Sequence, residues 1–156
     1  MPVFDCATGE SREHTQEELA AMVPTLDEAK AASRAAVTDR LTAILSAGYH
    51  HDFGDPHGVQ VLQTRDNTDR INWLTSQAAY SAAVMSGAGA APGATFRTAD
   101  NVDIILSYAD GHGVLLAMAA WGASQYANSW ALKNAIAAAE DADALAAIDT
   151  ASGWSG

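Results

Sequence analysis

The stretch from Gly111 to Ala139, GHGVLLAMAAWGASQYANSWALKNAIAAA, determines the architecture of this chain. It contains no proline, much of it is alanine, and Lys133 is its single formal charge. We expect a long helix from about Ala109 to Ala139. A surface helix normally has a charged face opposite its apolar one, and this stretch has none. We therefore expect the helix to be covered on more than one side.

A heptad pattern with alternating steps of three and four residues runs along this helix. Its positions are Leu115, Met118, Gly122, Gln125, Ser129, Leu132 and Ile136. We interpret this seam as an interface between copies of the chain, with another face of the helix on the domain's own hairpins. A helix that is covered entirely within one subunit explains the same pattern, and this alternative stays open.

The segment from Gly113 to Leu132 has no formal charge and is about as long as a membrane-spanning helix. Its second half contains serine, glutamine and asparagine, and its strongly apolar part, Val114 to Trp121, is too short to span a bilayer. We expect a buried core helix and no membrane insertion.

Helix-start and helix-stop signals divide the rest of the chain. Thr15 with Glu18 forms a capping box for a short helix that ends before Pro24, and Thr25 with Glu28 repeats the motif. The remaining expected elements are a helix at 26–46, a hairpin at 49–64, a helix at 67–86, a flexible linker at 87–94, a hairpin at 95–107 with Val102, Ile104 and Leu106 facing inward, and a short helix at 142–148.

This order predicts an α+β fold that is mostly helical, with two short β-hairpins alternating with helices and one long alanine-rich helix near the C-terminus. We divide the chain into an N-terminal lead, residues 1–24, which is a candidate docking segment, and a single domain, residues 25–156.

The composition argues against several classes of partner. The formal net charge is −11, from 19 acidic and 8 basic residues, with no basic run. Nucleic-acid binding depends on Lys and Arg neutralising phosphates, so we expect no nucleic-acid partner, and docking on an anionic membrane is disfavoured for the same reason. Cys6 is the single cysteine and cannot form an internal disulfide.

The best candidate for site chemistry is the HHDFGDPH stretch, which holds His50, His51 and His57 with two aspartates. Imidazoles and carboxylates suit a transition metal. Adjacent residues of a strand point to opposite faces, however, so His50 and His51 cannot easily reach one ion. Asp, Pro and Gly here also suit a turn. We keep the three histidines as weak metal candidates.

No residue combination indicates catalysis. The DGHG stretch, Asp110 to Gly113, lacks the Lys-Ser/Thr ending of a phosphate-binding loop. Ser124, Ser129 and Ser152 have no His or acid at motif spacing. We expect a protein that is not an enzyme and that uses no cofactor.

The C-terminal stretch SWALKNAIAAAEDADALAAIDTASGW resembles the signature of an uncharacterised domain family found in bacteriophage tail and tail-fibre proteins. The matching parts are Ser129 to Lys133, Asp141 to Asp143, Leu145 to Asp149, and Gly153-Trp154. The resemblance covers residues 26–154. The histidine-rich hairpin of this chain is longer than the corresponding hairpin in the family pattern.

The resemblance implies a virion component of a phage tail or a prophage-like particle, in the fibre or baseplate, made in the host cytoplasm. It would assemble as a homo-oligomer, with a trimer as the expected state, would bind other tail proteins through residues 1–24, and could bind a host receptor. Two alternatives stay open. One is a tail-fibre assembly chaperone that is absent from the finished particle, and the other is a small metal-dependent cytosolic enzyme that uses the histidine cluster.

Trp154 follows the last expected helix, where a chain end is normally polar and mobile. Burial of its ring would stabilise the fold by roughly 3 kcal/mol or more. We therefore expect Trp154 to act as a C-terminal latch, seated against the domain's helices or against an adjacent subunit.

Overall fold

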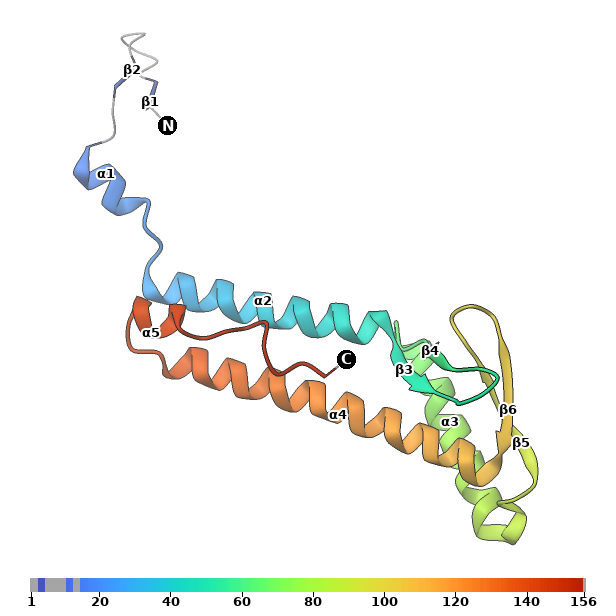
Figure 1. Ribbon diagram of the computed structural model, residues 1–156. Helices are drawn as coiled ribbons and strands as arrows, with labels where there is room; N and C mark the ends of the chain where they lie inside the picture. The colour runs from blue at the N-terminus through green and yellow to red at the C-terminus, as the bar shows by residue number, and fades with distance from the viewer. Residues whose placement is uncertain (1–2, 5–10, 13–14, 156) are drawn as a thin grey trace.

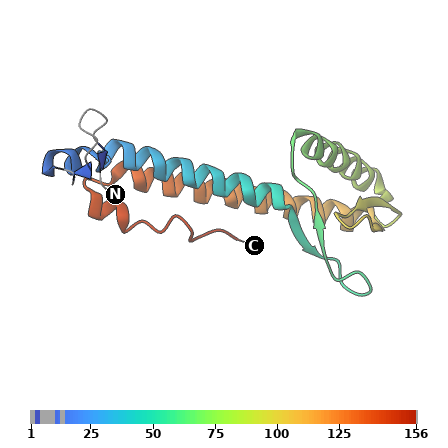
Figure 2. The ribbon, with the colours of Figure 1, turned by 90° about the horizontal axis from the view of Figure 1, so that it is seen from above.

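Two long antiparallel helices form the body of the protein. The structure, a computed structural model, describes residues 3–4, 11–12 and 15–155. Helices α2 (Leu26–Ala47) and α4 (Tyr108–Ala138) lie side by side, and α3 (Asn67–Ala83) lies beside the first half of α4 (Figures 1 and 2). With the hairpins between the helices, this confirms the predicted α+β class.

Helix α2 begins with the predicted capping box. The Thr25 side chain accepts a hydrogen bond from the Glu28 amide, and the Glu28 carboxylate accepts one from the Thr25 amide at 2.8 Å. Three buried residues at four-residue spacing, Val37, Leu41 and Leu45, form the apolar stripe of α2, the helix that packs along α4. Lys30 Nζ donates to the Ala137 carbonyl at 3.1 Å, so a cation from α2 lies at the negative C-terminal end of α4.

Two antiparallel hairpins pack on the N-terminal half of α4. The first pairs β3 (Tyr49–Asp52) with β4 (Val59–Leu62), and the second pairs β5 (Pro92–Arg97) with β6 (Asp103–Ser107). The buried cluster at this end joins the hairpins to α3 and α4, and its members are Leu62, Tyr80, Ala94, Phe96, Ile104, Val114 and Leu115.

The connection between α3 and β5 is ordered by hydrogen bonds, so the prediction of a flexible linker at 87–94 was wrong. The wide helical turn η1 (Val84–Ala88) continues α3, and β5 already begins at Pro92. The Gly89 and Ala91 carbonyls accept hydrogen bonds from the Ala109 and Tyr108 amides at 2.9 and 3.1 Å. The residues of this connection are small, glycine and alanine, and this lets its backbone come close enough to hydrogen-bond with the start of α4.

The second hairpin differs from its predicted orientation at one position. Ile104 is fully buried and Leu106 is partly buried, but Val102 is 38% exposed. Val102 precedes β6, and its amide donates to Thr98 Oγ1 in the hairpin turn, so strand alternation does not extend to it.

The end of the chain folds back along the body. Helix α5 (Ala142–Ala146) is capped by Asp141, whose side chain accepts from the Ala144 amide, and residues 149–155, which we call the C-terminal tail, return along α4. The tail and α3 lie on opposite sides of the α2–α4 pair (Figure 2). Within the described residues, no helix is long and apolar enough to cross a membrane.

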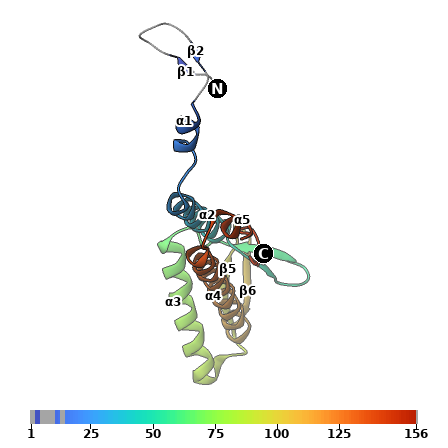
Figure 3. The same cartoon turned by 90° about the vertical axis from the view of Figure 1, so that its left-hand side faces the viewer.

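From this body, the described parts of the N-terminal lead project away (Figures 1 and 3). Its described parts are the paired strands β1 (Val3–Phe4) and β2 (Ser11–Arg12) and the helix α1 (Gln16–Ala21). Thr15 and Glu18 form the predicted reciprocal bonds at the start of α1. Cys6 lies outside the described residues.

Two glycines of α4 provide a matched test of the packing between α4 and the second hairpin. A Cβ on Gly111 would collide with Ala94 Cβ and lie 3.3 Å from Phe96 Cε2, whereas a Cβ on Gly113 meets nothing within 4 Å. We predict that Gly111→Ala lowers the free energy of unfolding by about 1–3 kcal/mol through overpacking. Gly113→Ala should raise it by about 0.5–1 kcal/mol, because alanine is the better helix former. Chemical denaturation measures both, and equal effects would show that the close contact is absent.

Candidate functional site: an apolar groove and a seated C-terminal tail

An apolar groove of about 230 Å³ lies between α3 and α4. We call it the α3–α4 groove. Its lining is mostly aliphatic and aromatic and comes from α2, α3, α4 and the end of the first hairpin: Leu45, Thr64, Arg70, Trp73, Leu74, Gln77, Leu115, Met118, Ala119, Trp121, Gly122 and Tyr126. A concave apolar surface with few polar groups is the usual form of a binding site.

Two indoles of the groove are held by their polar ends. Trp73 Nε1 donates to the Gln63 carbonyl at 2.7 Å, and Trp121 Nε1 donates to the Ser155 carbonyl at 3.3 Å. Tyr49 lies beside Trp121 with ring centroids 5.5 Å apart. Both indoles are therefore oriented before any partner binds, and this reduces the entropy lost on binding.

Arg70 provides the positive charge of the groove. Its neighbour Arg65 is paired with Asp69, with Nε 3.0 Å from Oδ2. The hydrogen bond from Arg65 lowers the pKa of the Asp69 carboxyl, so Asp69 stays ionised and paired at neutral pH. Arg70 donates at 3.4 Å to Asn67 Oδ1 and pairs with no carboxylate among the residues that the structure describes.

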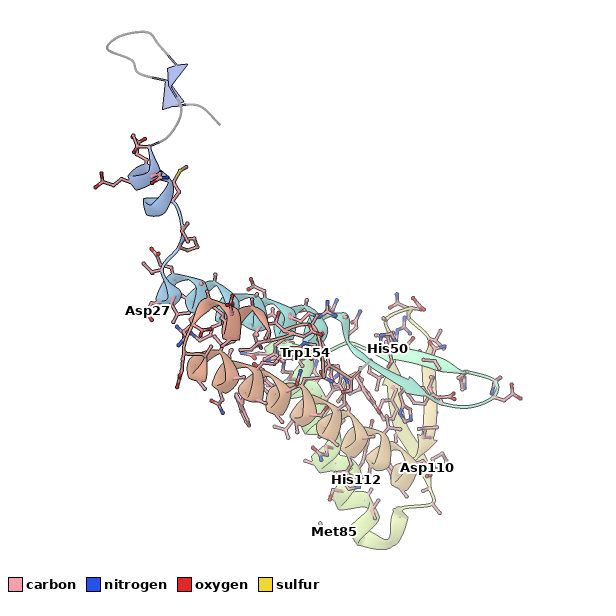
Figure 4. All side chains as sticks on the ribbon, turned by 60° about the vertical axis from the view of Figure 1, so that its left-hand side comes forward. Asp27, His50, Met85, Asp110, His112 and Trp154 are labelled. Carbon is pink, nitrogen blue, oxygen red and sulfur yellow. The ribbon has the colours of Figure 1, made fainter. Side chains whose placement is uncertain are left out.

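Large apolar side chains extend the groove onto the surface. Leu74 is 65% exposed at its edge, and Trp130, one turn beyond Tyr126 on α4, is 63% exposed. The Tyr126 and Trp130 rings lie 6.2 Å apart. Ile71 on α3 is also exposed. Met85 is exposed as well and lies in η1, which continues the C-terminal end of α3 (Figure 4).

Four of the seven residues of the α4 heptad seam are buried inside the single chain, so the assignment of the whole seam to an interface between copies is corrected, although Met118 and Gly122 also line the α3–α4 groove. Leu115, Gln125, Ser129 and Ile136 are all at most 2% exposed in the single chain, and Met118, Gly122 and Leu132 are partly buried. The second half of α4 packs against α2, and the first half packs against the hairpins and α3. The helix therefore buries most of this seam without a second subunit. The oligomeric state itself stays a prediction.

Polar residues of α4 bind the backbone of the C-terminal tail. Gln125 Nε2 donates to the Ser155 carbonyl at 2.8 Å, and Asn128 Nδ2 donates to the Ser152 carbonyl at 3.1 Å. The polar half of α4 is thus the seat of the tail. Two buried atoms nearby, Gln125 Oε1 and Ser129 Oγ, have no hydrogen-bond partner among the described residues.

Gly153 lets the tail approach α4 closely. Its φ is +77°, which favours glycine, and a Cβ here would collide with Asn128 Oδ1 and lie 3.0 Å from Asn128 Cγ. Trp154 follows at once, partly buried, and its indole N–H donates to the Thr150 carbonyl at 3.0 Å.

Trp154 lies against the domain's own helices. It lines a hollow of about 200 Å³ with Arg40 and Ile44 of α2 and Trp121 of α4, and Figure 4 labels it on the tail that runs beside these two helices. Trp154 was expected to pack either on the domain's own helices or on an adjacent subunit. In the structure it lies beside the helices of its own chain. Its contribution to stability stays a prediction.

The three histidines of the first hairpin are spread over different surfaces. His50 lines the hollow beside Trp154, whereas His51 lines a separate hollow with Asp52 and Asp110. His57 lies in the loop, where its amide donates to the Gly54 carbonyl at 2.8 Å. Among the residues that the structure describes, no group of three or more His, Cys, Asp or Glu side chains could hold a metal ion.

A protein-family comparison places these elements in a known family. The family described as "Domain of unknown function (DUF4376)" matches residues 28–151, which run from Glu28 in the first turn of α2 to beyond α5. The chain belongs to the DUF4376 family. Comparisons with curated proteins and with solved structures found no match. The matched region leaves out the lead and the end of the tail, so Gly153 and Trp154 lie beyond it.

Sequence reasoning missed the α3 wall of the groove. The sequence of α3 places apolar residues on two faces, Ile71 and Leu74 on one and Trp73 and Tyr80 on the other. Only Tyr80 is buried, Trp73 is partly buried, and Ile71 and Leu74 are exposed. A helix with two apolar faces in a small domain was the signal that one of these faces lies outside the core.

We predict that Trp154→Ala lowers the free energy of unfolding by about 1–3 kcal/mol, because the partly buried ring leaves its contacts with α2 and α4. Trp130→Ala removes an equally large ring that is 63% exposed, and it should change the stability by less than about 0.5 kcal/mol. Thermal melts at two protein concentrations measure both variants. The Trp154→Ala loss should be the same at both concentrations because the contact lies within one chain. Equal losses for the two variants would contradict the seated tail.

Proposed function

We propose that this protein is a structural component of the tail of a phage or prophage-like particle, in the fibre or baseplate, and that it acts through protein–protein contacts. The observation that carries the proposal is the apolar surface formed by the groove with Leu74, Tyr126 and Trp130. Exposed, contiguous apolar surface on a small domain is typical of a protein interaction site.

Two further features support this function. The lead projects from the body with Met22 and Val23 exposed, as expected for a segment that contacts another molecule. The C-terminal signature, from the Ser129–Lys133 helix to Gly153-Trp154, resembles that of tail-protein domains, and its last two residues, Gly153 and Trp154, lie in the tail that packs on α2 and α4. Membership of the DUF4376 family is compatible with this proposal and names no activity.

Particle composition tests the proposal directly. Mass spectrometry of purified particles should detect the chain at a stoichiometry fixed relative to the other tail proteins. A chain that is found in the lysate with a fibre protein and is missing from particles would favour the assembly chaperone. A chain found in neither place would contradict both functions.

Removal of residues 1–24 should leave a folded domain that no longer enters particles, because the lead is set off from the body by Pro24 and the capped start of α2. Circular dichroism and particle incorporation measure the two effects separately. A truncated protein that fails to fold would show that the lead belongs to the core, and normal incorporation would show that it is not a docking segment.

Trp130→Ser should reduce incorporation into particles while leaving the melting temperature nearly unchanged, because Trp130 is exposed on the proposed contact surface. Ile105→Ser is the matched control: Ile105 is 65% exposed on β6, outside the groove lining, and its loss should leave incorporation unchanged. Equal incorporation of both variants would remove the α4 surface from the proposed contact.

A further inference from the structure

We propose that the α3–α4 groove binds the segment Glu17–Val23 of a second copy of this chain, so that copies associate by exchange of their N-terminal leads. The inference names a partner for the groove and does not rest on the assignment to a phage tail, because purified protein tests it. This contact differs from the predicted α4 seam, of which only Leu115, Met118 and Gly122 line the groove.

The groove has the form that a short apolar helix or turn requires. Its floor is Leu115, Met118 and Gly122, and Trp73 and Trp121 flank it with indole rings that are already held by hydrogen bonds. Gly122 leaves open space, because a Cβ there would meet nothing within 4 Å. Large side chains from a partner can therefore enter without moving the helix.

The segment Glu17–Val23 has the complementary chemistry. Met22 is 65% exposed and Val23 is 69% exposed, and both lie between α1 and Pro24, where the lead joins the body. Seating these side chains in the groove removes them from water, at about 25 cal/mol per Å² of apolar surface. Methionine in particular adapts to irregular aromatic-lined sites.

Charge complementarity orients the segment. Arg70 is the single charged residue of the groove lining, in a chain of net charge −11. Glu17 is exposed in the first turn of α1, five positions before Met22. With Met22 and Val23 in the apolar part of the groove, the carboxylate of Glu17 can approach Arg70 at its rim.

The segment cannot reach the groove of its own chain. Helix α2 rises 1.5 Å per residue, so Leu45 at the groove lies about 28 Å from Leu26 along the helix. Met22 is four residues before Leu26, and even a fully extended chain places it no more than about 14 Å away. The occupant from this sequence must therefore come from a second copy.

Such a contact joins two different surfaces, the lead of one copy and the groove of another. Two copies can exchange leads reciprocally, or successive copies can close a ring, as in the expected trimer. In both cases every groove is filled.

Variants of the groove test the inference. The purified full chain should be an oligomer at about 10 µM, a concentration at which a micromolar complex is largely formed. Gly122→Glu places a carboxylate in the apolar floor of the groove, where Met22 and Val23 are expected to lie, and should lower the association constant by roughly tenfold or more. Gly113→Glu is the control, because Gly113 lies on the same helix, also has no heavy atom within 4 Å of an added Cβ, and is outside the groove lining. It should associate like the unmodified chain.

Variants of the lead complete the test. The double variant Met22→Ser with Val23→Ser changes side chains outside the folded body and should likewise lower the association constant by roughly tenfold or more. A mixture of this double variant with Gly122→Glu should form a mixed dimer, because one copy supplies an intact groove and the other an intact lead. Analytical ultracentrifugation of each protein and of the mixture measures this.

Three results would overturn the inference: an unmodified chain that is monomeric at about 100 µM, a Gly122→Glu protein that associates as well as Gly113→Glu, or a mixture that stays monomeric. If Gly122→Glu loses its helical circular dichroism signal, the variant is unfolded. The association and mixing experiments are then repeated with Leu74→Glu in place of Gly122→Glu. Leu74 is 65% exposed on the opposite wall, so that substitution does not disturb the core.

Discussion

The burial of α4 is the constraint on which the rest of this structure depends. A helix of 31 residues with hardly any charge cannot stay in water, and the protein covers it in sections. The hairpins and α3 bury Val114 and Leu115, and α2 packs along the half that contains Gln125 and Ile136. Each of these elements is too short or too narrow in its apolar surface to form a core alone. They share α4 as their common partner.

The polar residues in the second half of α4 have a role that follows from the same constraint. Their amides bind the backbone carbonyls of the C-terminal tail, which would otherwise lie unpaired against a helix. Gly153 allows the approach and Trp154 adds apolar contact with α2. The ending Gly-Trp is therefore part of the fold, and the tail covers the side of the helix pair that α3 leaves open.

Trp121 connects the two surface features of the protein. Its ring lines the α3–α4 groove and also the hollow that holds Trp154, and its indole N–H donates to the tail at Ser155. The seated tail thus fixes one wall of the groove. Loss of the tail would free this indole to rotate, so the shape of the groove depends on a segment that lies on the opposite side of α4.

Local signals in the sequence determined the elements and most of their ends. The Thr25–Glu28 box, the Asp66 and Ser107 caps, and the long alanine-rich run act within one turn or along one helix, so they can be read without tertiary structure. The register of Ile104 and the class of fold follow from the same short-range periodicity.

Only the tertiary structure decided which apolar faces find a partner inside the chain. The α4 heptad pattern looks the same whether α2 or a second subunit covers it, because both would bury the same side chains. The two apolar faces of α3 are equally apolar in sequence, yet Trp73 turns inward and Leu74 stays exposed. The reason is that coverage depends on where α2, the hairpins and the tail lie in space, and no local pattern contains that information.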